Sequence, residues 1–244
     1  MNEPSSSNSE QRTASREPLH PLSIWAPIII AVLGIVVFYN YLIYRSRIDK
    51  QDRPPVLGRL EKDLELTERS GKKVHLAELK GKVLVISWVF TRCPRGCAAV
   101  IAKLMKLHQE FGNEPNLQFV SFTLDADDTP EMMKKFASGL GIKDDANWWF
   151  VNGDKDAVRK FMTSQAQFRP VQDMPEKDRL SPEDKYIHDL RVAVIDHLGH
   201  VRGLEDILNP DPEFAKFWDE KLRKDLRYLL NEQKKTPYTP VGTK

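Results

Sequence analysis

The sequence has few cysteines: two among 244 residues, at positions 93 and 97. A pair this close in the chain cannot cross-link distant segments, so no disulfide framework is available to hold the fold. No second cysteine pair and no His-x-x-x-His spacing accompanies it, which argues against a structural zinc site with four protein ligands. We therefore expect the hydrophobic residues, 41% of the chain, to build one core of ordinary size.

The chain also lacks excess charge of either sign. Its 37 Lys and Arg residues are interleaved with 35 Asp and Glu residues, so the formal charge is only +2. This excludes the basic surface that is typical of nucleic-acid-binding proteins, and we expect no nucleic-acid partner. The sequence shows no repeat period and no glycine-rich phosphate loop, because Gly139 and Gly141 form an isolated pair at the end of a predicted helix.

Charged residues are absent from the segment 22–44. Its length of about 23 residues is enough to cross a bilayer as a helix. Trp25, Tyr39, Tyr41 and Tyr44 lie near its ends, as interfacial anchors do. A cleaved signal peptide is the competing interpretation, but the run is long for one and ends without a convincing small-residue cleavage site. We predict a single retained transmembrane helix.

The composition on either side of this helix divides the rest of the chain. The residues before it are rich in Ser, Glu, Asn and Arg and show no apolar period, which is typical of disorder. A polar segment with Pro54 and Pro55 follows it, which is typical of a linker. The predicted organisation is a disordered arm at 1–21, a transmembrane anchor at 22–44, a linker at 45–57, a folded domain at 58–231 and a loose tail at 232–244.

Both cysteines lie where a predicted strand turns into a predicted helix. Apolar β-branched and aromatic residues predict a strand at 83–90, and apolar residues at helical spacing predict a helix at 97–111. Cys93 then lies in the turn and Cys97 in the first turn of the helix, where unpaired amides and the helix dipole lower thiol pKa values. Two such thiolates can bind a soft metal ion or form a redox-active disulfide. A structural disulfide or two ordinary buried thiols is the alternative.

The remaining pattern alternates strands and helices. Apolar residues that alternate around Ser70 and Gly71 predict a β-hairpin at 64–79, and three prolines predict a long loop at 164–185. Further strands are predicted at 117–124, 148–151, 190–195 and 200–204. Further helices are predicted after caps at Thr129 and Asp154 and at 211–230. This order predicts an α/β sheet covered on both faces. With the cysteines after a central strand, the nearest architecture is a thioredoxin-like fold with an N-terminal β-hairpin.

At the cysteine turn the sequence resembles the Sco/SenC family, membrane-anchored copper chaperones that help to assemble the copper A centre of cytochrome c oxidase. The family motif Cys-Pro-x-x-Cys after a strand that ends in Phe-Thr matches Phe90, Thr91, Cys93, Pro94 and Cys97. The stretches LQFVSFTLDADDTPEMMKKFA and NWWFVNGDKDAVRKF also resemble the family, so the similarity spans most of 57–230. The resemblance implies a thioredoxin fold and a role in copper delivery.

The family's third metal ligand is a histidine just ahead of a strand, and the matching position is His188 in YIHDLRVAVID. Taken alone, such a histidine is more often a solvated loop residue. The resemblance thus implies that Cys93, Cys97 and His188 bind copper, and this donor set suits both oxidation states, because thiolates prefer Cu(I) and an imidazole nitrogen helps to hold Cu(II). We expect no ligand among the other histidines, which are His20, His75, His108, His197 and His200.

Two groups of charged residues have simpler explanations than a metal site. Asp125, Asp127 and Asp128 do not match a calcium loop and are predicted to form a solvated turn with a helix cap. Arg92 and Arg95 flank the cysteines. They are either solvated, or they favour thiolates and steer an acidic partner.

The leading hypothesis is a copper-binding assembly factor that is not an enzyme in the turnover sense and that meets subunit II of cytochrome c oxidase or another copper acceptor. The alternative is a membrane-tethered thiol–disulfide oxidoreductase that uses Cys93 and Cys97. Their three intervening residues, where thioredoxin-type reductants have two, count against it. The resemblance implies a soluble domain in the periplasm, on a bacterial inner membrane in preference to a mitochondrial one, although basic residues after the anchor taken alone predict the opposite orientation.

Overall fold

The computed structural model describes residues 21–51, 53–125 and 127–239, and in the first helix it describes the side chains of 25–43. The chain divides into two units, Met1–Asp52 and Arg53–Lys244, which are described separately. Apart from Pro21, the arm predicted at 1–21 lies outside the described residues.

The first unit contains one helix, α1 (Pro21–Gln51). Its segment Trp25–Ile43 has a mean hydropathy of 2.3 and is long and apolar enough to cross a membrane, by length and composition. The helix runs seven residues beyond the predicted end at 44, so the linker expected from residue 45 is helical as far as Gln51. These residues include good helix formers such as Arg and Lys and contain no Gly or Pro, whereas Pro54 and Pro55 cannot continue a helix.

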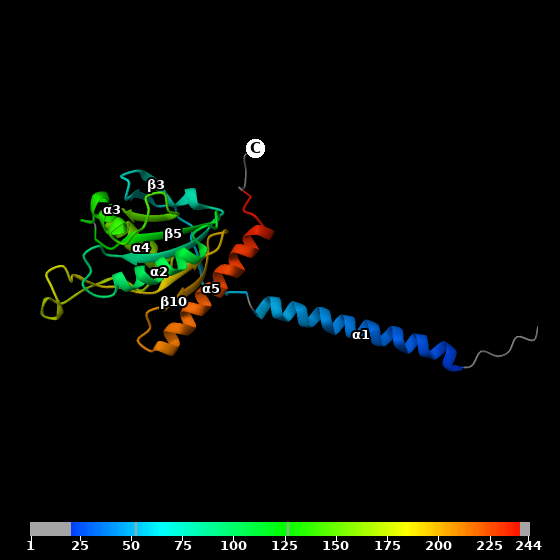
Figure 1. Cartoon of the computed structure of the whole chain (residues 1–244). Coiled ribbons are helices and arrows are strands. Elements are labelled where there is room, and N and C mark those ends of the chain that lie inside the picture. The colour runs from blue at the N-terminus through cyan, green and yellow to red at the C-terminus, as the bar shows by residue number, and fades with distance from the viewer. Residues whose placement is uncertain (1–20, 52, 126, 240–244) are drawn as a thin grey trace, which may run out of the picture. The chain divides into compact units, whose positions relative to one another are not determined.

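The second unit is built on an eight-stranded sheet in the order β1-β10-β9-β4-β5-β6-β2-β3 (Figure 1). The central strands β4, β5 and β6 are parallel, and β9 and β10 continue the sheet in antiparallel pairing. Every residue of β4 and β5 is buried, as expected of strands covered on both faces. The strands are β1 (Gly58–Arg59), β2 (Glu65–Glu68), β3 (Lys73–His75), β4 (Val83–Val89), β5 (Leu117–Thr123), β6 (Trp148–Asn152), β9 (Val192–Ile195) and β10 (His200–Glu205).

Helices cover both faces of this sheet. Side chains of α2 (Cys97–Phe111), α3 (Pro130–Gly139) and α5 (Pro212–Lys235) pack into one hydrophobic cluster, and those of α4 (Lys155–Ser164) pack into the other. Along β4, alternate residues point into the two clusters. The units β4-α2-β5 and β9-β10-α5 form the thioredoxin-like core, and the predicted α/β class, hairpin and thioredoxin-like architecture are confirmed.

Three local predictions need correction. The segment predicted as one long loop contains β7 (Gln172–Asp173), which pairs with β8 (Tyr186–Ile187), and a short 3-10 helix at Glu176–Asp178. The hairpin ends at β3, and Leu76–Leu79 is a 3-10 helix because the Asp63 carboxylate accepts a hydrogen bond from the Ala77 amide at 2.8 Å. Helix α5 continues to Lys235, into the tail predicted from residue 232, because residues 232–235 (Glu, Gln, Lys, Lys) are good helix formers.

Candidate metal centre

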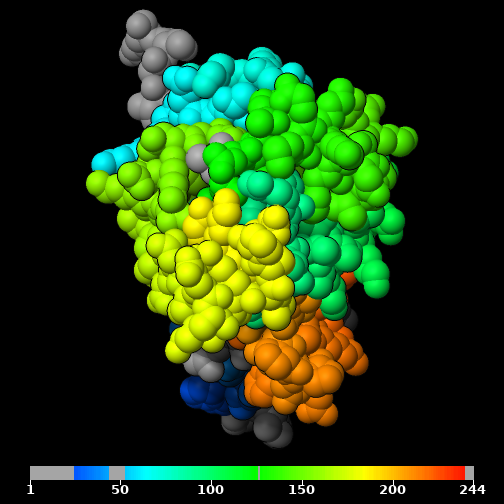
Figure 2. Space-filling view, turned by 90° about the vertical axis from the view of Figure 1, so that its left-hand side faces the viewer, coloured from blue at the N-terminus to red at the C-terminus, as the bar shows by residue number. Residues whose placement is uncertain are grey.

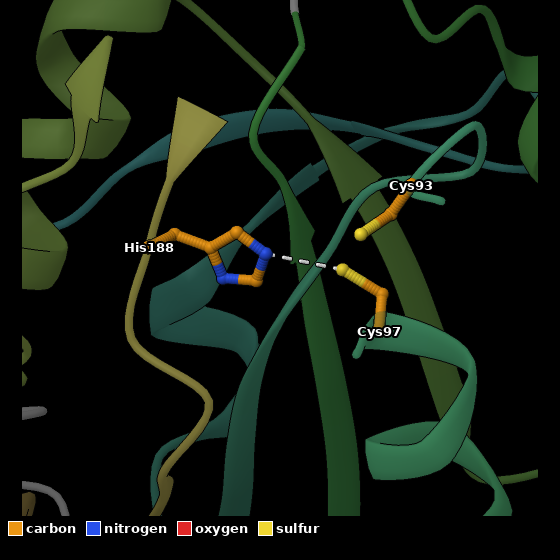
Figure 3. Close-up of side chains that lie close together, drawn as sticks. All are labelled: Cys93, Cys97 and His188. Atoms are coloured by element: carbon orange, nitrogen blue, oxygen red, sulfur yellow. Dashed lines mark hydrogen bonds between the residues drawn. The ribbon is translucent and has the colours of Figure 1, made fainter. Parts of the chain in front are cut away.

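Three side chains that are far apart in the sequence meet at the carboxyl end of β4. Cys93 lies in the turn after this strand, Cys97 is the first residue of α2, and His188 directly follows β8 (Figure 3). Their potential ligand atoms all lie within 4.8 Å of one another. Cys97 Sγ is 3.2 Å from His188 Nε2. The structure therefore brings together all three residues that the sequence analysis singled out.

The close approach of the histidine segment to the cysteine turn depends on Gly96. A Cβ atom added at this position would lie 2.8 Å from Leu190 Cδ1, closer than side-chain atoms can pack. Gly96 immediately precedes α2, and Leu190 lies two residues after His188. The glycine thus leaves room for the segment that carries the imidazole. Figure 2 shows this segment, in yellow, lying against the blue-green start of α2.

The imidazole of His188 is oriented by its own neighbour. Nδ1 lies 3.0 Å from the backbone oxygen of Asp189. When Nδ1 carries the proton and donates it to this carbonyl, Nε2 keeps its lone pair and faces the sulfur of Cys97. Histidines that bind metals commonly have this arrangement, in which the second ring nitrogen donates to a carbonyl or carboxylate.

The carboxylate of Asp189 holds the same segment from inside the protein. It is buried and accepts hydrogen bonds from Arg191 Nε at 2.9 and 3.0 Å and from the Arg169 amide at 2.9 Å. Burial raises the pKa of this carboxyl, but the bonds from Arg191 and Arg169 outweigh it and hold the pKa below its usual value. Asp189 is therefore an ionised anchor for the segment that carries His188, and its carboxylate is bound to Arg191 and to the Arg169 amide.

The two free cysteines have different protonation states. A hydrogen bond from Cys97 lowers the pKa of Cys93 to about 4, with further help from His188 and two backbone groups and against the effect of burial. The same contact and burial raise the pKa of Cys97, which is only 1% exposed. The expectation that the start of the helix lowers the pKa of both thiols is thus corrected for Cys97. Without a metal, Cys93 is the thiolate and Cys97 the thiol, and a bound metal ion must displace the Cys97 proton.

Of the three aspartates that the sequence predicts to form a solvated turn after β5, Asp127 is exposed as predicted, but the other two are buried. Asp125 is buried and pairs with Arg92 at 2.7 Å. Asp128 is completely buried and accepts hydrogen bonds from the hydroxyls of Thr91 and Thr123, each at 2.5 Å. The predicted cap of the next helix is present at Thr129. The carboxylates therefore fasten the cysteine turn to β5 and are already bound to protein groups.

Arg95, in the same turn, also forms an ion pair with a buried carboxylate. Its Nε lies 2.9 and 2.8 Å from the two carboxylate oxygens of Asp184, and its Nη2 donates to the Asp178 backbone oxygen at 2.9 Å. The Arg95 side chain is 40% exposed, whereas that of Asp184 is 3% exposed. Both arginines next to the cysteines are thus paired with carboxylates, so neither is simply solvated.

The other histidines stay apart from this group within the described chain. His75 pairs with Asp63 at 2.9 Å, His108 bonds Asn147 at 2.6 Å, and His200 bonds Asp196 at 3.1 Å. His197 lies in the turn between β9 and β10 and is 2% exposed. His20 lies outside the described residues.

The sequence did not predict the roles of Asp184 and Asp189, because no local pattern shows that a carboxylate in a loop is buried.

Comparison with known proteins places this geometry in a family. The chain is similar to the "SCO1 protein homolog" of Bacillus subtilis (strain 168), with 30% identity over 123 residues, 49% of this chain and 60% of that protein. The match thus spans about three fifths of the relative's length. A crystal structure of a SCO1/SenC family lipoprotein from Bacillus anthracis shows 27% identity and a TM-score of 0.56, over 70% of this chain and 98% of that one.

The fold is also that of Bradyrhizobium japonicum ScoI, a structure with copper bound. Identity is 20% over 66% of this chain and 99% of that one, with a TM-score of 0.51. The SCO1/SenC family model matches residues 54–220. Because this match covers well over half of the sequence, the chain belongs to the SCO1/SenC family.

Proposed function

We propose that Cys93, Cys97 and His188 bind copper and that the protein is a copper-binding assembly factor for the copper A centre of cytochrome c oxidase. The observation that carries this proposal is the convergence of two sulfurs and one imidazole nitrogen within 4.8 Å. Thiolates are soft ligands that prefer Cu(I), and the added nitrogen makes a mixed site that also suits Cu(II). The copper-bound ScoI structure supports the same assignment.

The donor set fits copper better than zinc. Structural zinc is almost always bound by four protein ligands, and among the described residues the group contains three. Cys93 and His188 are partly exposed while Cys97 is buried. A site with two ligands at the surface can pass its ion to a partner, because the partner's own ligands can replace them one at a time.

The copper acceptor in this proposal is subunit II of cytochrome c oxidase or another copper protein, with the domain in the periplasm and α1 as the anchor in a bacterial inner membrane. Arg45, Arg47 and Lys50 after the apolar segment favour the opposite orientation, but long C-terminal domains translocate despite local charge. Labelling Cys93 in intact cells with a membrane-impermeant maleimide tests the orientation. Labelling only after lysis would place the domain in the cytoplasm.

The test of copper binding uses the full-length protein in detergent micelles. We expect one copper ion per chain and a Cu(II)–thiolate absorption band. Cys93→Ser and Cys97→Ser should abolish the band, and His188→Ala should shift it and weaken binding. His75→Ala is the matched control, because His75 is exposed and lies outside the group. Copper binding that is equal in the parent and in all three site variants would refute the assignment.

A second candidate function follows from the split protonation of the two thiols. In a thiol–disulfide exchange, the Cys93 thiolate attacks a partner disulfide and forms a mixed disulfide while the first partner sulfur leaves as a thiolate. Cys97 then loses its proton to that sulfur and attacks Cys93, which releases the second partner thiolate. Two electrons pass to the partner, and Cys93 and Cys97 become a disulfide. Rapid reduction of a disulfide substrate by the metal-free protein, together with no copper binding, would favour this function.

A further inference from the structure

A pocket of about 420 Å³ lies at the end of the main sheet opposite to the metal centre. Its walls include Lys82, just before β4, Leu84, the second residue of that strand, and Leu198 and Gly199 in the turn between β9 and β10. The cysteine turn follows the other end of β4, and a strand of this length spans roughly 20 Å. An occupant of this pocket therefore cannot contact the copper ligands, and the pocket is a separate site.

The floor of the pocket is apolar. Leu76, Leu79 and Leu84 line it and are 6%, 3% and 5% exposed. Tyr238, from the segment after α5, closes one side, where it packs over Gly81. Four segments from different parts of the chain thus converge on a hollow whose volume is in the range of small-molecule sites, about 300–1,000 Å³. Its floor favours a ligand with an apolar body.

The positive charges around the pocket lack anionic partners. Four basic residues line it, and within the described part of the chain none of them forms an ion pair; they are Arg59, Lys62, Lys80 and Lys82. Two of the three carboxylates that line it already have partners, because Asp63 pairs with His75 and Asp196 pairs with Arg202. The unpaired charge at the pocket is therefore mainly positive, which favours an anion.

His197 belongs to the closed part of the pocket wall, and its ring nitrogens do not open into the cavity. It forms part of the pocket wall and is 2% exposed, and neither of its ring nitrogens has a hydrogen-bond partner among the described residues. Buried polar side-chain atoms in native proteins are nearly always hydrogen-bonded, to protein or to a bound molecule. An occupant of the pocket cannot supply a partner for His197, because both ring nitrogens are closed off from solvent.

From these features we propose that the pocket binds a small molecule with one carboxylate or phosphate group on a short aromatic or aliphatic body. The lysines attract the anionic group, and the leucine floor and Tyr238 cover the apolar body. This site is independent of copper, and its ligand chemistry differs from that of the Cys93, Cys97 and His188 group.

The test is photoaffinity labelling of the full-length protein in lipid nanodiscs with 4-azidobenzoate as the probe. After irradiation, peptide mapping should find the label mainly in peptides that contain residues 59–63, 76–84 and 196–199. Benzoate and phenyl phosphate should compete, and whichever acts at the lower concentration identifies the preferred anionic group. Benzylamine, which has the same apolar body and a positive charge, should not compete.

A charge-reversal variant at the rim of the pocket distinguishes labelling inside the pocket from general labelling of the protein surface. The exposed double variant Lys62→Glu, Lys80→Glu should lower the labelling about fivefold or more. Lys216→Glu on α5 is the matched control, since Lys216 is 77% exposed and remote from the pocket lining. Cys93→Ser should leave the labelling unchanged, so the result does not depend on copper binding. Label spread over exposed aromatic residues such as Phe214 and Phe217, or equal competition by benzylamine, would overturn the proposal.

Discussion

Arg95 and Asp184 form a two-pronged ion pair that joins the cysteine turn to the segment carrying His188. Nη2 of Arg95 lies 2.7 Å from Oδ2 of Asp184, in addition to the two contacts of Nε. The Asp184 carboxylate also accepts the Leu180 amide at 2.9 Å. Arg95 lies between the two cysteines, and Asp184 lies four residues before the histidine. The pair therefore ties the segment that carries His188 to the turn that carries the two sulfurs.

We predict that Asp184→Asn weakens copper binding by about 10- to 100-fold, the range found when groups that position metal ligands are removed. The amide can no longer pair with the Arg95 charge, so the His188 segment loses its tie to the cysteine turn. Competition with a chelator of known copper affinity measures the effect. Asp173→Asn, on the exposed strand β7, is the control and should bind copper like the parent. If Asp184→Asn binds copper as tightly as Asp173→Asn does, Asp184 does not position His188.

We predict that iodoacetamide alkylates Cys93 and spares Cys97 in the metal-free reduced protein. Cys93 has a pKa of about 4 and is partly exposed, whereas Cys97 is buried and its pKa is raised. The Cys93 rate should stay nearly constant from about pH 6 to pH 8, because the thiolate is already fully formed. An ordinary thiol would react about tenfold faster for each pH unit over the same range. Mass spectrometry of the alkylated peptides measures both rates.

Much of the central fold could be predicted from the sequence because its signals are local. The strand at 83–90 and the helix at 97–111 agree with β4 and α2 to within one residue, since a continuous apolar run and a helical period specify each of them. The Cys93, Cys97 and His188 group was predicted from a motif and a resemblance. Neither source shows how His188 reaches the cysteines, which depends on the space at Gly96 and on the Asp189 anchor.

The missed features depend on contacts between distant residues. Strands β1 and β7 have two residues each, too few to show any period, and they exist because β10 and β8 pair with them. Asp128 and Asp184 look like solvated loop residues, yet Thr91 and Arg95 are the partners that allow them to be buried. A pattern in one segment cannot show which residue from another segment will lie beside it.

We predict that Gly96→Ala destabilises the metal-free protein by about 1 kcal/mol, at the low end of the cost of overpacking. The new Cβ would meet Leu190 Cδ1 at 2.8 Å, and the end of a leucine side chain can move aside. Copper affinity should fall as well, because the movement displaces the segment that carries His188. Leu190→Ala in the same chain should restore the copper affinity. A double variant that binds copper as weakly as Gly96→Ala would show that the contact is unimportant.

The final prediction concerns acid stability and rests on Asp196, at the end of the sheet away from the metal centre. Burial raises the pKa of this carboxyl, but the His200 amide and the Arg202 side chain outweigh it and hold the pKa below 3.8, the usual value. Folding therefore favours the ionised form. The resulting stability is fully present above the unfolded-state pKa and is lost as the pH falls through the folded-state pKa.

We therefore expect the free energy of unfolding of the metal-free protein to decrease below about pH 4, with Asp196 contributing up to about 1.4 kcal/mol per pH unit. Asp196→Asn removes the titrating group, so its stability should be lower at neutral pH and should change less in acid. Urea unfolding monitored by tryptophan fluorescence at several pH values measures both curves. Asp173→Asn is again the control, because that side chain is exposed on β7. Parallel curves for the parent and Asp196→Asn would show that acid unfolding is controlled by other carboxylates, such as Asp189, whose pKa is also lowered.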